Sequence, residues 1–334
     1  MEKMKALVGI EGNVACGERD LPPLPSGEIR LSVLRCGICG SDLHWFRHGF
    51  VPAICPGHEI VGEVTGDVPE GSSVRAGERV TVEAVRSCGA CSYCKAGSRQ
   101  LCTQLGLVGV DRPGGFAEFL DVLPSQIHRV PESLSSEVAT FAEPVAVAVH
   151  ALRLGPSPVG KKALVLGGGT IGLLTAFCLV RAGASSVDIT AKRSHQRTAA
   201  EQLGSTSILQ PGESQENSYD LVYETVGGDG ATITEALSAV RPGGTIVVLG
   251  VFADPPLLPA LQLMCKEIRM VGAMCYGTAS GVADFETAHQ ILKDDGDAIA
   301  ARLLTHSYTL EQVDEAFSTA LDKDSGSIKV QVAI

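Results

Sequence analysis

Ala163-Leu164-Val165-Leu166-Gly167-Gly168-Gly169-Thr170-Ile171-Gly172-Leu173-Leu174 is the stretch of sequence that decides the fold of this chain. Its apolar start is typical of a buried parallel strand, and it runs directly into the pattern Gly-x-Gly-x-x-Gly. In that setting Gly167 allows a tight turn, Gly169 lets the backbone approach a pyrophosphate, and Gly172 lets the next helix pack on the strand. The N–H groups at the start of that helix can bind phosphates. The stretch therefore predicts a dinucleotide-binding site rather than a bare turn.

From Lys161 onward strands and helices alternate, which predicts a doubly wound parallel sheet with its ligand at the carboxyl ends of the strands. We expect helices up to Arg181, over His195–Leu203 and over Thr232–Val240. The expected strands are Ala163–Leu166, Ser186–Thr190, Leu221–Glu224, Thr245–Leu249 and Ile268–Val271.

The rest of the chain reads differently. Residues 1–145 hold short β-like runs separated by Gly and Pro, which predicts an antiparallel, barrel-like domain. Residues 146–275 form the cofactor domain, and residues 276–334 form a C-terminal part with helices over Asp284–Leu292 and Leu310–Leu321 and a last strand, Ile328–Ala333. The polar stretch Lys293–Asp297 is interpreted as a solvated connection.

The composition indicates a globular protein and excludes several classes. Of the 334 residues 45% are hydrophobic, but no run approaches the length of about 18 apolar residues that spans a bilayer. The formal net charge of −11, without a long basic run, argues against nucleic acid as the main partner. Because the first residues lack the apolar core of a signal peptide, we expect a cytoplasmic protein without a membrane partner.

The β-rich part contains side chains of the kinds that bind zinc. Cys36-Gly-Ile-Cys39-Gly-Ser41-Asp-Leu-His44 is followed by Pro-Gly-His58-Glu59. Thiolate, imidazole and carboxylate are zinc ligands, and a catalytic zinc site keeps one position open for water or substrate. Taken singly, however, a cysteine is usually a small buried apolar residue, and a His-Glu pair usually lies on the surface.

A second cysteine group has a more specific spacing. Cys88, Cys91, Cys94 and Cys102 place four thiols within fifteen residues, a pattern that suits a closed tetrahedral zinc site. An iron–sulfur cluster is the competing chemistry, and a zinc ribbon that binds nucleic acid is disfavoured by the acidic composition. We predict a structural zinc, because four protein ligands leave no position for substrate.

Glu143 lies among apolar residues just before a helical run. A buried carboxylate is unfavourable unless it is paired or bound to a metal. Alternatively, a carboxylate at a helix start is stabilised by the helix dipole alone.

The order of these motifs along the chain resembles that of the zinc-containing medium-chain dehydrogenase/reductases, in the branch of the polyol and threonine dehydrogenases. The motifs that carry the resemblance also include Gly114-Gly-Phe-Ala-Glu118 and Glu143-Pro144, and it covers nearly the whole chain. It implies a GroES-like catalytic domain, a Rossmann cofactor domain and a C-terminal tail that returns to the catalytic domain. It also implies a homodimer or homotetramer.

The resemblance further implies that Cys36 and His58 bind the catalytic zinc, with Glu59 or Glu143 as the third protein ligand. It assigns Ser41 to contact with the substrate oxygen and His44 to the far end of a proton relay. The segment Arg47–Pro56 is shorter than sorbitol-type enzymes lead us to expect, so polyol specificity does not transfer with the resemblance.

The expected activity is hydride transfer between a nicotinamide cofactor and a secondary alcohol, polyol or amino alcohol, or the matching ketone. The alternatives are an enzyme for primary alcohols and aldehydes, and a cofactor-binding protein without enzymatic activity.

The end of the second strand of the cofactor domain predicts which cofactor is used. NAD-specific folds place an acidic residue there to bind the ribose hydroxyls. By the spacing from Gly167 that the resemblance implies, the tip of this strand falls on Ala191, and Lys192 and Arg193 follow it. Because a guanidinium can bind a 2′-phosphate through two hydrogen bonds, we predict a preference for NADP(H). Asp188 is the rival residue, but it lies in the middle of the strand. The other residues expected to contact the cofactor are Thr170, Ile171, Arg197 and Thr225.

Overall fold

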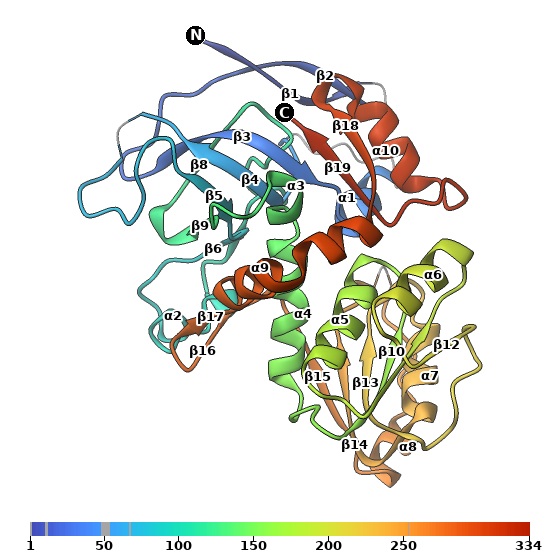
Figure 1. Ribbon diagram of the computed structural model, residues 1–334. Coiled ribbons are helices and arrows are strands. Elements are labelled where there is room, and N and C mark those ends of the chain that lie inside the picture. Colours follow the sequence, from blue (N-terminus) through green and yellow to red (C-terminus); the bar gives the residue numbers. More distant parts are fainter. Residues whose placement is uncertain (1, 11–12, 48–53, 67, 253) are drawn as a thin grey trace. The chain divides into compact units, whose positions relative to one another are not determined.

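The computed structural model describes residues 2–10, 13–47, 54–66, 68–252 and 254–334 (Figure 1). Most of the segment Arg47–Pro56, with its shorter length, lies outside these residues. The chain forms two compact units, one of Met1–Glu143 with Ser280–Ile334 and the other of Pro144–Ala279. The sequence places the boundaries after residues 145 and 275. No helix in the described part of the chain is long and apolar enough to cross a membrane.

The second unit is a six-stranded parallel sheet with helices between its strands (green to orange in Figure 1), which confirms the predicted doubly wound fold. The strand order is β12-β11-β10-β13-β14-β15, so the chain reverses its direction of travel across the sheet between β10 and β13. The strands are β10 (Lys162–Leu166), β11 (Ser186–Thr190), β12 (Ser207–Leu209), β13 (Tyr219–Glu224), β14 (Val240–Val248) and β15 (Arg269–Gly272). The helices are α4 (Ala142–Leu154, shared with the first unit), α5 (Thr170–Arg181), α6 (Ser194–Gln202), α7 (Ala231–Ala239) and α8 (Ala260–Cys265).

The apolar runs that predict these strands form the core of the second unit. Leu164, Leu166, Val222 and Ile246 are fully buried on neighbouring strands, and helix α7 packs Ile233 and Leu237 against them. Burying side chains of this size contributes about 1.5–3 kcal/mol each, which outweighs the modest strand preference of the backbone itself.

The first unit is built on a seven-stranded sheet, with β18, β19, β3, β4, β5 and β9 in order and β8 paired to β3. β18 and β19 come from the C-terminal segment, which confirms the predicted return of the tail (red beside blue in Figure 1). The seven strands are β3 (Ile29–Gly37), β4 (Glu59–Val64), β5 (Arg79–Val82), β8 (Phe119–Val122), β9 (Ile127–Arg129), β18 (Leu304–Thr309) and β19 (Lys329–Ala333).

The remaining elements lie outside these two sheets. The remaining strands are β1 (Lys3–Ile10), β2 (Asn13–Asp20), β6 (Val85–Arg86), β7 (Gly106–Leu107), β16 (Thr278–Ala279) and β17 (Val282–Ala283). The remaining α-helices are α1 (Gly40–Arg47), α2 (Ser92–Lys95), α3 (Ser136–Ala139), α9 (Asp284–Leu303) and α10 (Val313–Leu321), and three 3₁₀ turns cover 99–101, 124–126 and 310–312.

Helix α9 is longer than predicted, and the interpretation of Lys293–Asp297 as a solvated connection is wrong. The polar residues and Gly296 mask the helical pattern in the sequence, but Ile299 and Leu303 continue the buried face. A side-chain carbon at Gly296 would lie 2.4 Å from a methyl group of Val138 in α3, so the glycine permits close packing of the two helices.

Helix α9 packs on the sheet of the first unit through a buried histidine. The ring of His289 is hydrogen-bonded at Nε2 to the Thr81 hydroxyl of β5 at 3.0 Å, and its edge meets the ring of His128 at 6.3 Å. Burial, with a smaller effect of His128, lowers the pKa of His289 from 6.5 to about 4. The imidazole is therefore neutral when buried and takes up a proton readily only when the protein unfolds.

This histidine predicts a loss of stability in weak acid. Between pH 6.5 and 4 the unfolded chain binds the proton that the folded chain refuses, so stability falls as the pH falls through that window. The two pKa values give a loss of about 2 kcal/mol between pH 7 and pH 5. His289→Gln keeps a hydrogen-bonding group for Thr81 but does not titrate. Between pH 7 and pH 5 the unfolding free energy of this variant, measured with urea, should therefore fall by about 2 kcal/mol less than that of the wild type. Parallel pH profiles for the wild type and the variant would contradict the assignment.

Candidate functional site

The antiparallel pairing of β3 with β4 brings two of the predicted zinc ligands into one region. Cys36 pairs with Ile60, and Gly37 pairs with Glu59, the residue after His58. The Cys36 thiol is fully buried. Gly57 has φ +101°, and a side-chain carbon there would lie 2.7 Å from the Cys36 sulfur. Glycine at this position therefore allows the turn before His58 and its close approach to the thiol.

Helix α1 supplies the groups around the His58 ring. The Ser41 hydroxyl lies 3.4 Å from His58 Nε2, and Asp42 Oδ1 lies 3.6 Å from Nδ1. The other Asp42 oxygen accepts the Cys39 N–H at 2.9 Å, which fixes the buried carboxylate. Burial alone would lower the pKa of His58, but the Asp42 carboxylate raises it well above its usual value. His44 lies one turn further along α1 and is half-buried.

Asp42 was not among the predicted site residues. The sequence does offer a signal, because an acidic residue in the first turn after a Cys-Gly-Ile-Cys loop can cap the helix start. Its second role, beside an imidazole sixteen residues away, depends on the fold.

Glu59 is held by a buried lysine. Lys329 Nζ on β19 lies 2.6 and 2.7 Å from the two Glu59 carboxylate oxygens and donates a third hydrogen bond to the Ile38 carbonyl at 3.0 Å. Both side chains of the ion pair are almost fully buried. Burial would lower the pKa of Lys329, but Glu59 outweighs it and the pKa is raised. Lys329 was not among the predicted site residues, since no sequence feature near it indicates a partner 270 residues away.

Glu143 lies in the first turn of helix α4 and is buried, with 7% of its surface exposed. Burial raises the pKa of its carboxyl to about 7, and the carboxylates of Glu59 and Asp42 add to the effect. His58 and Lys329 act in the opposite direction, so Glu143 shares one buried group of charges with them.

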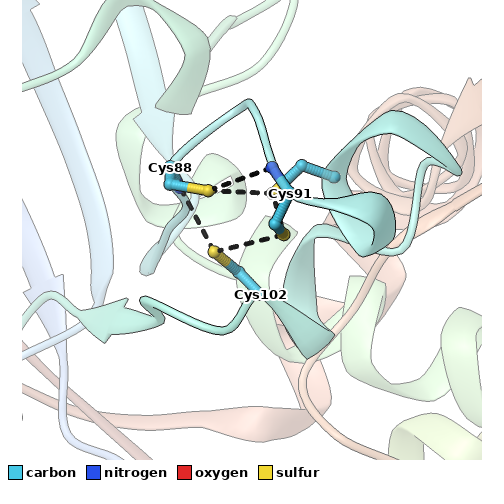
Figure 2. A group of neighbouring side chains, drawn as sticks. Cys88, Cys91 and Cys102 are labelled. Atoms are coloured by element: carbon cyan, nitrogen blue, oxygen red, sulfur yellow. Dashed lines mark hydrogen bonds between the residues drawn. The ribbon is translucent and has the colours of Figure 1, made fainter.

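The four cysteines of the second group lie together, as Figure 2 shows for three of them. Their sulfur atoms are all within 4.8 Å of one another, with Cys91 and Cys94 at 3.5 Å and Cys91 and Cys102 at 3.9 Å. Backbone N–H groups point at the sulfurs and lower the pKa of Cys91 to about 6. Four such thiols suit a tetrahedral zinc.

Within the described residues this is the one set with three or more possible metal ligands in such close proximity. Cys36, His58 and the two glutamates occupy one region of the first unit, but their ligand atoms do not form an equally tight group. The thiol, imidazole and carboxylate of Cys36, His58 and the glutamates nevertheless fit zinc chemically, and His58 Nδ1 is buried without a hydrogen bond.

In the second unit the glycine motif has the geometry that dinucleotide binding requires. Gly167 has φ +113°, and a side-chain carbon at Gly172 would lie 1.8 Å from the Gly167 carbonyl oxygen. Nothing lies within 4 Å of the place where a side chain at Gly169 would begin, so the start of α5 is open on that side. Thr170 and Ile171 form the first turn of this helix. The Thr225 hydroxyl donates to the Leu166 carbonyl at 2.7 Å, which ties the loop after β13 to this turn.

The end of β11 presents its charged residues in different ways. Lys192 is exposed and Arg193 half-buried, while the Arg197 guanidinium donates to the Ala191 and Ile208 carbonyls at 3.4 and 3.0 Å. Asp188 accepts the Tyr219 hydroxyl at 2.8 Å. Arg197 therefore shapes the backbone around Ala191, and Asp188 is engaged by the neighbouring strand β13.

Comparison with known proteins agrees with both units. Residues 25–132 match the alcohol dehydrogenase GroES-like domain family, and residues 136–334 match the glucose dehydrogenase C-terminus family. The chain is 31% identical to a D-altritol 5-dehydrogenase of Agrobacterium fabrum over 99% of both chains. It is also 31% identical to an L-threonine 3-dehydrogenase of Streptomyces coelicolor, over 97% of this chain and 98% of the relative. A Sinorhizobium meliloti structure, described as a zinc-binding dehydrogenase bound to NADP, aligns over all of both chains with a TM-score of 0.87 and 27% identity.

The chain therefore belongs to the zinc-containing medium-chain dehydrogenase/reductases, in the branch of the threonine and polyol dehydrogenases. It is an oxidoreductase that acts on alcohol groups. This confirms the predicted family and enzyme class and sets aside the alternative of a protein without enzymatic activity.

The buried ion pair predicts a large effect of mutating Lys329. Lys329→Met leaves the Glu59 carboxylate buried without its counter-charge, which should lower the unfolding free energy by about 3–5 kcal/mol. The matched control is Lys3→Met, because the pair of Lys3 with Asp20 has a similar length of 2.7 Å but is about half exposed. Urea unfolding of the control should stay close to wild type. Equal effects of the two substitutions would contradict the importance of burial.

Proposed function

We propose that this protein is a zinc-dependent dehydrogenase that oxidises a secondary alcohol, polyol or amino alcohol, or reduces the matching ketone, with NADP(H) as cofactor. The observation that carries the proposal is the group of the buried Cys36 and His58 with the half-buried Ser41, in which thiol, imidazole and hydroxyl lie in one region. A D-altritol 5-dehydrogenase, an L-threonine 3-dehydrogenase and an L-idonate 5-dehydrogenase among the similar proteins support this substrate class.

Cys36 and His58 would hold the catalytic zinc, and Glu143 is the better candidate for the third ligand. The Glu59 carboxylate has both oxygens engaged by Lys329, whereas no hydrogen bond within the described residues engages the Glu143 carboxylate. When bound, zinc polarises the substrate oxygen and lowers the pKa of the alcohol.

The protein's own groups orient the substrate and move its proton. The Ser41 hydroxyl, next to His58, is placed to accept a hydrogen bond from the substrate alcohol and pass the proton on. His44, on the same helix, is the proposed far end of the relay. The start of α5 and the Gly167 turn would hold the pyrophosphate of the nicotinamide cofactor, which would supply the acceptor for the hydride of the carbinol carbon.

The four-cysteine group is proposed to hold a second, structural zinc. Its sulfurs already lie within 4.8 Å of one another, and the loop that carries them contains two short helical turns and little apolar surface. A metal would supply the folding energy that such a loop lacks.

The two zinc sites should respond differently to mutation. Metal analysis of the wild type should give about two zinc per chain. Cys36→Ala should abolish turnover with little change in the thermal midpoint, whereas Cys91→Ala should lower the midpoint by several degrees because the lobe loses its metal. Cys16→Ala, which changes a half-buried cysteine outside both groups, is the control and should keep both metals. Iron in place of zinc, or two zinc per chain in Cys91→Ala, would contradict the structural site.

NADP(H) preference is proposed to come from Arg193, with Lys192 assisting. These cations follow the buried Ala191 at the end of β11, where an NAD-specific protein has an acidic residue. The hydrogen bond that Asp188 accepts from Tyr219 engages the rival carboxylate within the sheet, and the Arg197 guanidinium donates to backbone carbonyls, both of which support the choice of Arg193.

A panel of secondary alcohols, polyols, amino alcohols and primary alcohols, each with both cofactors, tests substrate class and cofactor together. We expect secondary alcohols to be oxidised and kcat/KM to favour NADP. Arg193→Ala should reduce that preference about tenfold to a hundredfold, since a hydrogen bond to a charged group contributes about 1.5–3 kcal/mol. Arg181→Ala, at the far end of α5, should leave the preference unchanged. Equal or better use of NAD by the wild type would refute the cofactor proposal, and turnover of primary alcohols alone would favour the alternative substrate class.

A homo-oligomer is also proposed, either a dimer or a tetramer. Leu257, Leu261 and Met264, in and beside α8, are between 66% and 79% exposed, and β15 lies at the end of the sheet order. Apolar surface beside an unpaired strand edge is typical of an interface between subunits. A monomeric mass in solution would contradict this proposal.

The proposed location is the cytoplasm. Within the described residues none of the eleven cysteines forms a disulfide, and thiolate metal sites of this kind suit a reducing compartment.

A further inference from the structure

Glu224, the last residue of β13, is a fully buried carboxylate that none of the roles above uses. It lies at the carboxyl end of the strand that borders the crossover between β10 and β13. Ligands of doubly wound folds bind outside the strand ends at this crossover. A fully buried carboxylate there requires an explanation, because burying a charge is unfavourable without partners.

The partners of the Glu224 carboxylate lie in the loop that follows it and in the first turn of α7. The N–H groups of Val226 and Gly227 and the hydroxyl of Thr232 donate to Glu224 Oε1, each at 2.8 Å. One carboxylate oxygen therefore fixes the loop 225–230 at its start and the first turn of α7 at its end. The second oxygen, Oε2, is buried and has no hydrogen bond.

The same loop is joined to both neighbouring strands. Thr225 bonds to the Leu166 carbonyl next to Gly167, and Gly228 N–H donates to the Val251 carbonyl beyond β14 at 2.9 Å. The Glu224 carbonyl accepts the N–H groups of Leu249 and Gly250. Glu224 thus connects the segments that follow β10, β13 and β14.

The side chains on these segments face outward where the loop ends the sheet. Val226 is 52% exposed and Val251 is 66% exposed, although both flank strands with buried interiors. Because more than half of each side chain is exposed, hydrogen bonds fix the backbone at these positions: Glu224 Oε1 accepts the Val226 N–H, and the Val251 carbonyl accepts the Gly228 N–H.

We propose that Glu224 is a positioning residue for the nicotinamide cofactor: its Oε1 holds the loop 225–230 in the shape that binds the dinucleotide beside the Gly167 turn. This inference rests on the proposed use of a nicotinamide cofactor. This role depends on geometry rather than charge, because three donors converge on one oxygen while the other oxygen accepts no hydrogen bond.

Two substitutions separate geometry from charge. Glu224→Gln keeps an oxygen at the same reach and removes the charge, whereas Glu224→Asp keeps the charge but withdraws it by one methylene. We expect the dissociation constants of NADPH and NADH, measured by fluorescence titration of the full-length protein, to rise about tenfold or more in Glu224→Asp. In Glu224→Gln they should stay within about threefold of wild type. For Glu224→Asp, KM for the cofactor should rise more than kcat falls, and hydrogen exchange should speed up in residues 225–231.

The matched control is Asp220→Asn, at the opposite end of the same strand. Asp220 accepts hydrogen bonds from Lys162 N–H and the Arg241 side chain, so its variant should lower stability without changing cofactor affinity. Normal cofactor affinity in Glu224→Asp would overturn the inference, as would a loss in Glu224→Gln equal to that in Glu224→Asp or an equal loss in Asp220→Asn. A wild type that binds neither cofactor would instead overturn the proposed function together with the inference, and that outcome is visible before any variant is made.

Discussion

The buried ion pair of Glu59 and Lys329 is the interaction on which the first unit depends. It joins β4, which follows directly on His58, to β19, which is paired with β3 and so with Cys36. A lone charge in this position would be strongly destabilising, so neither residue can keep its place without the other. The pair therefore makes the return of the C-terminal segment a condition for assembling the candidate zinc site.

The second unit depends on a constraint of a different kind, namely the absence of side chains. At Gly167 and Gly172 any larger residue would collide with backbone or with the loop after β13. The close approach of strand, turn and helix leaves backbone N–H groups as the proposed binding surface for the pyrophosphate. Three side chains hold this backbone in place: Arg197 at the end of β11, Thr225 at the Gly167 turn and Glu224 at the loop beyond β13. One unit thus gathers polar side chains, while the other exposes main chain.

Local sequence patterns predicted much of the fold and of the candidate sites, because short-range interactions determine those features. The apolar run before Gly167 and the spacing from Cys88 to Cys102 specify a strand, a turn and a compact cysteine loop without reference to the rest of the chain. Lys329 and Glu224 were not predicted from the sequence, since a buried charge can be recognised only when its distant or backbone partners are known. The helix predicted for this region ended too early for a related reason. Gly296 weakens the helical pattern of α9, and its compensating contact with Val138 arises only from packing.

We propose that the protein holds two chemically different zinc ions, one bound by a single thiolate and one by four. Zinc K-edge X-ray absorption of the metal-loaded protein measures this directly. Averaged over both sites, the account predicts about 2.5 sulfur ligands per zinc at about 2.3 Å, together with shorter bonds to nitrogen and oxygen. Four sulfur ligands per zinc, without nitrogen or oxygen, would mean that Cys36 and His58 form no metal site and would contradict the account.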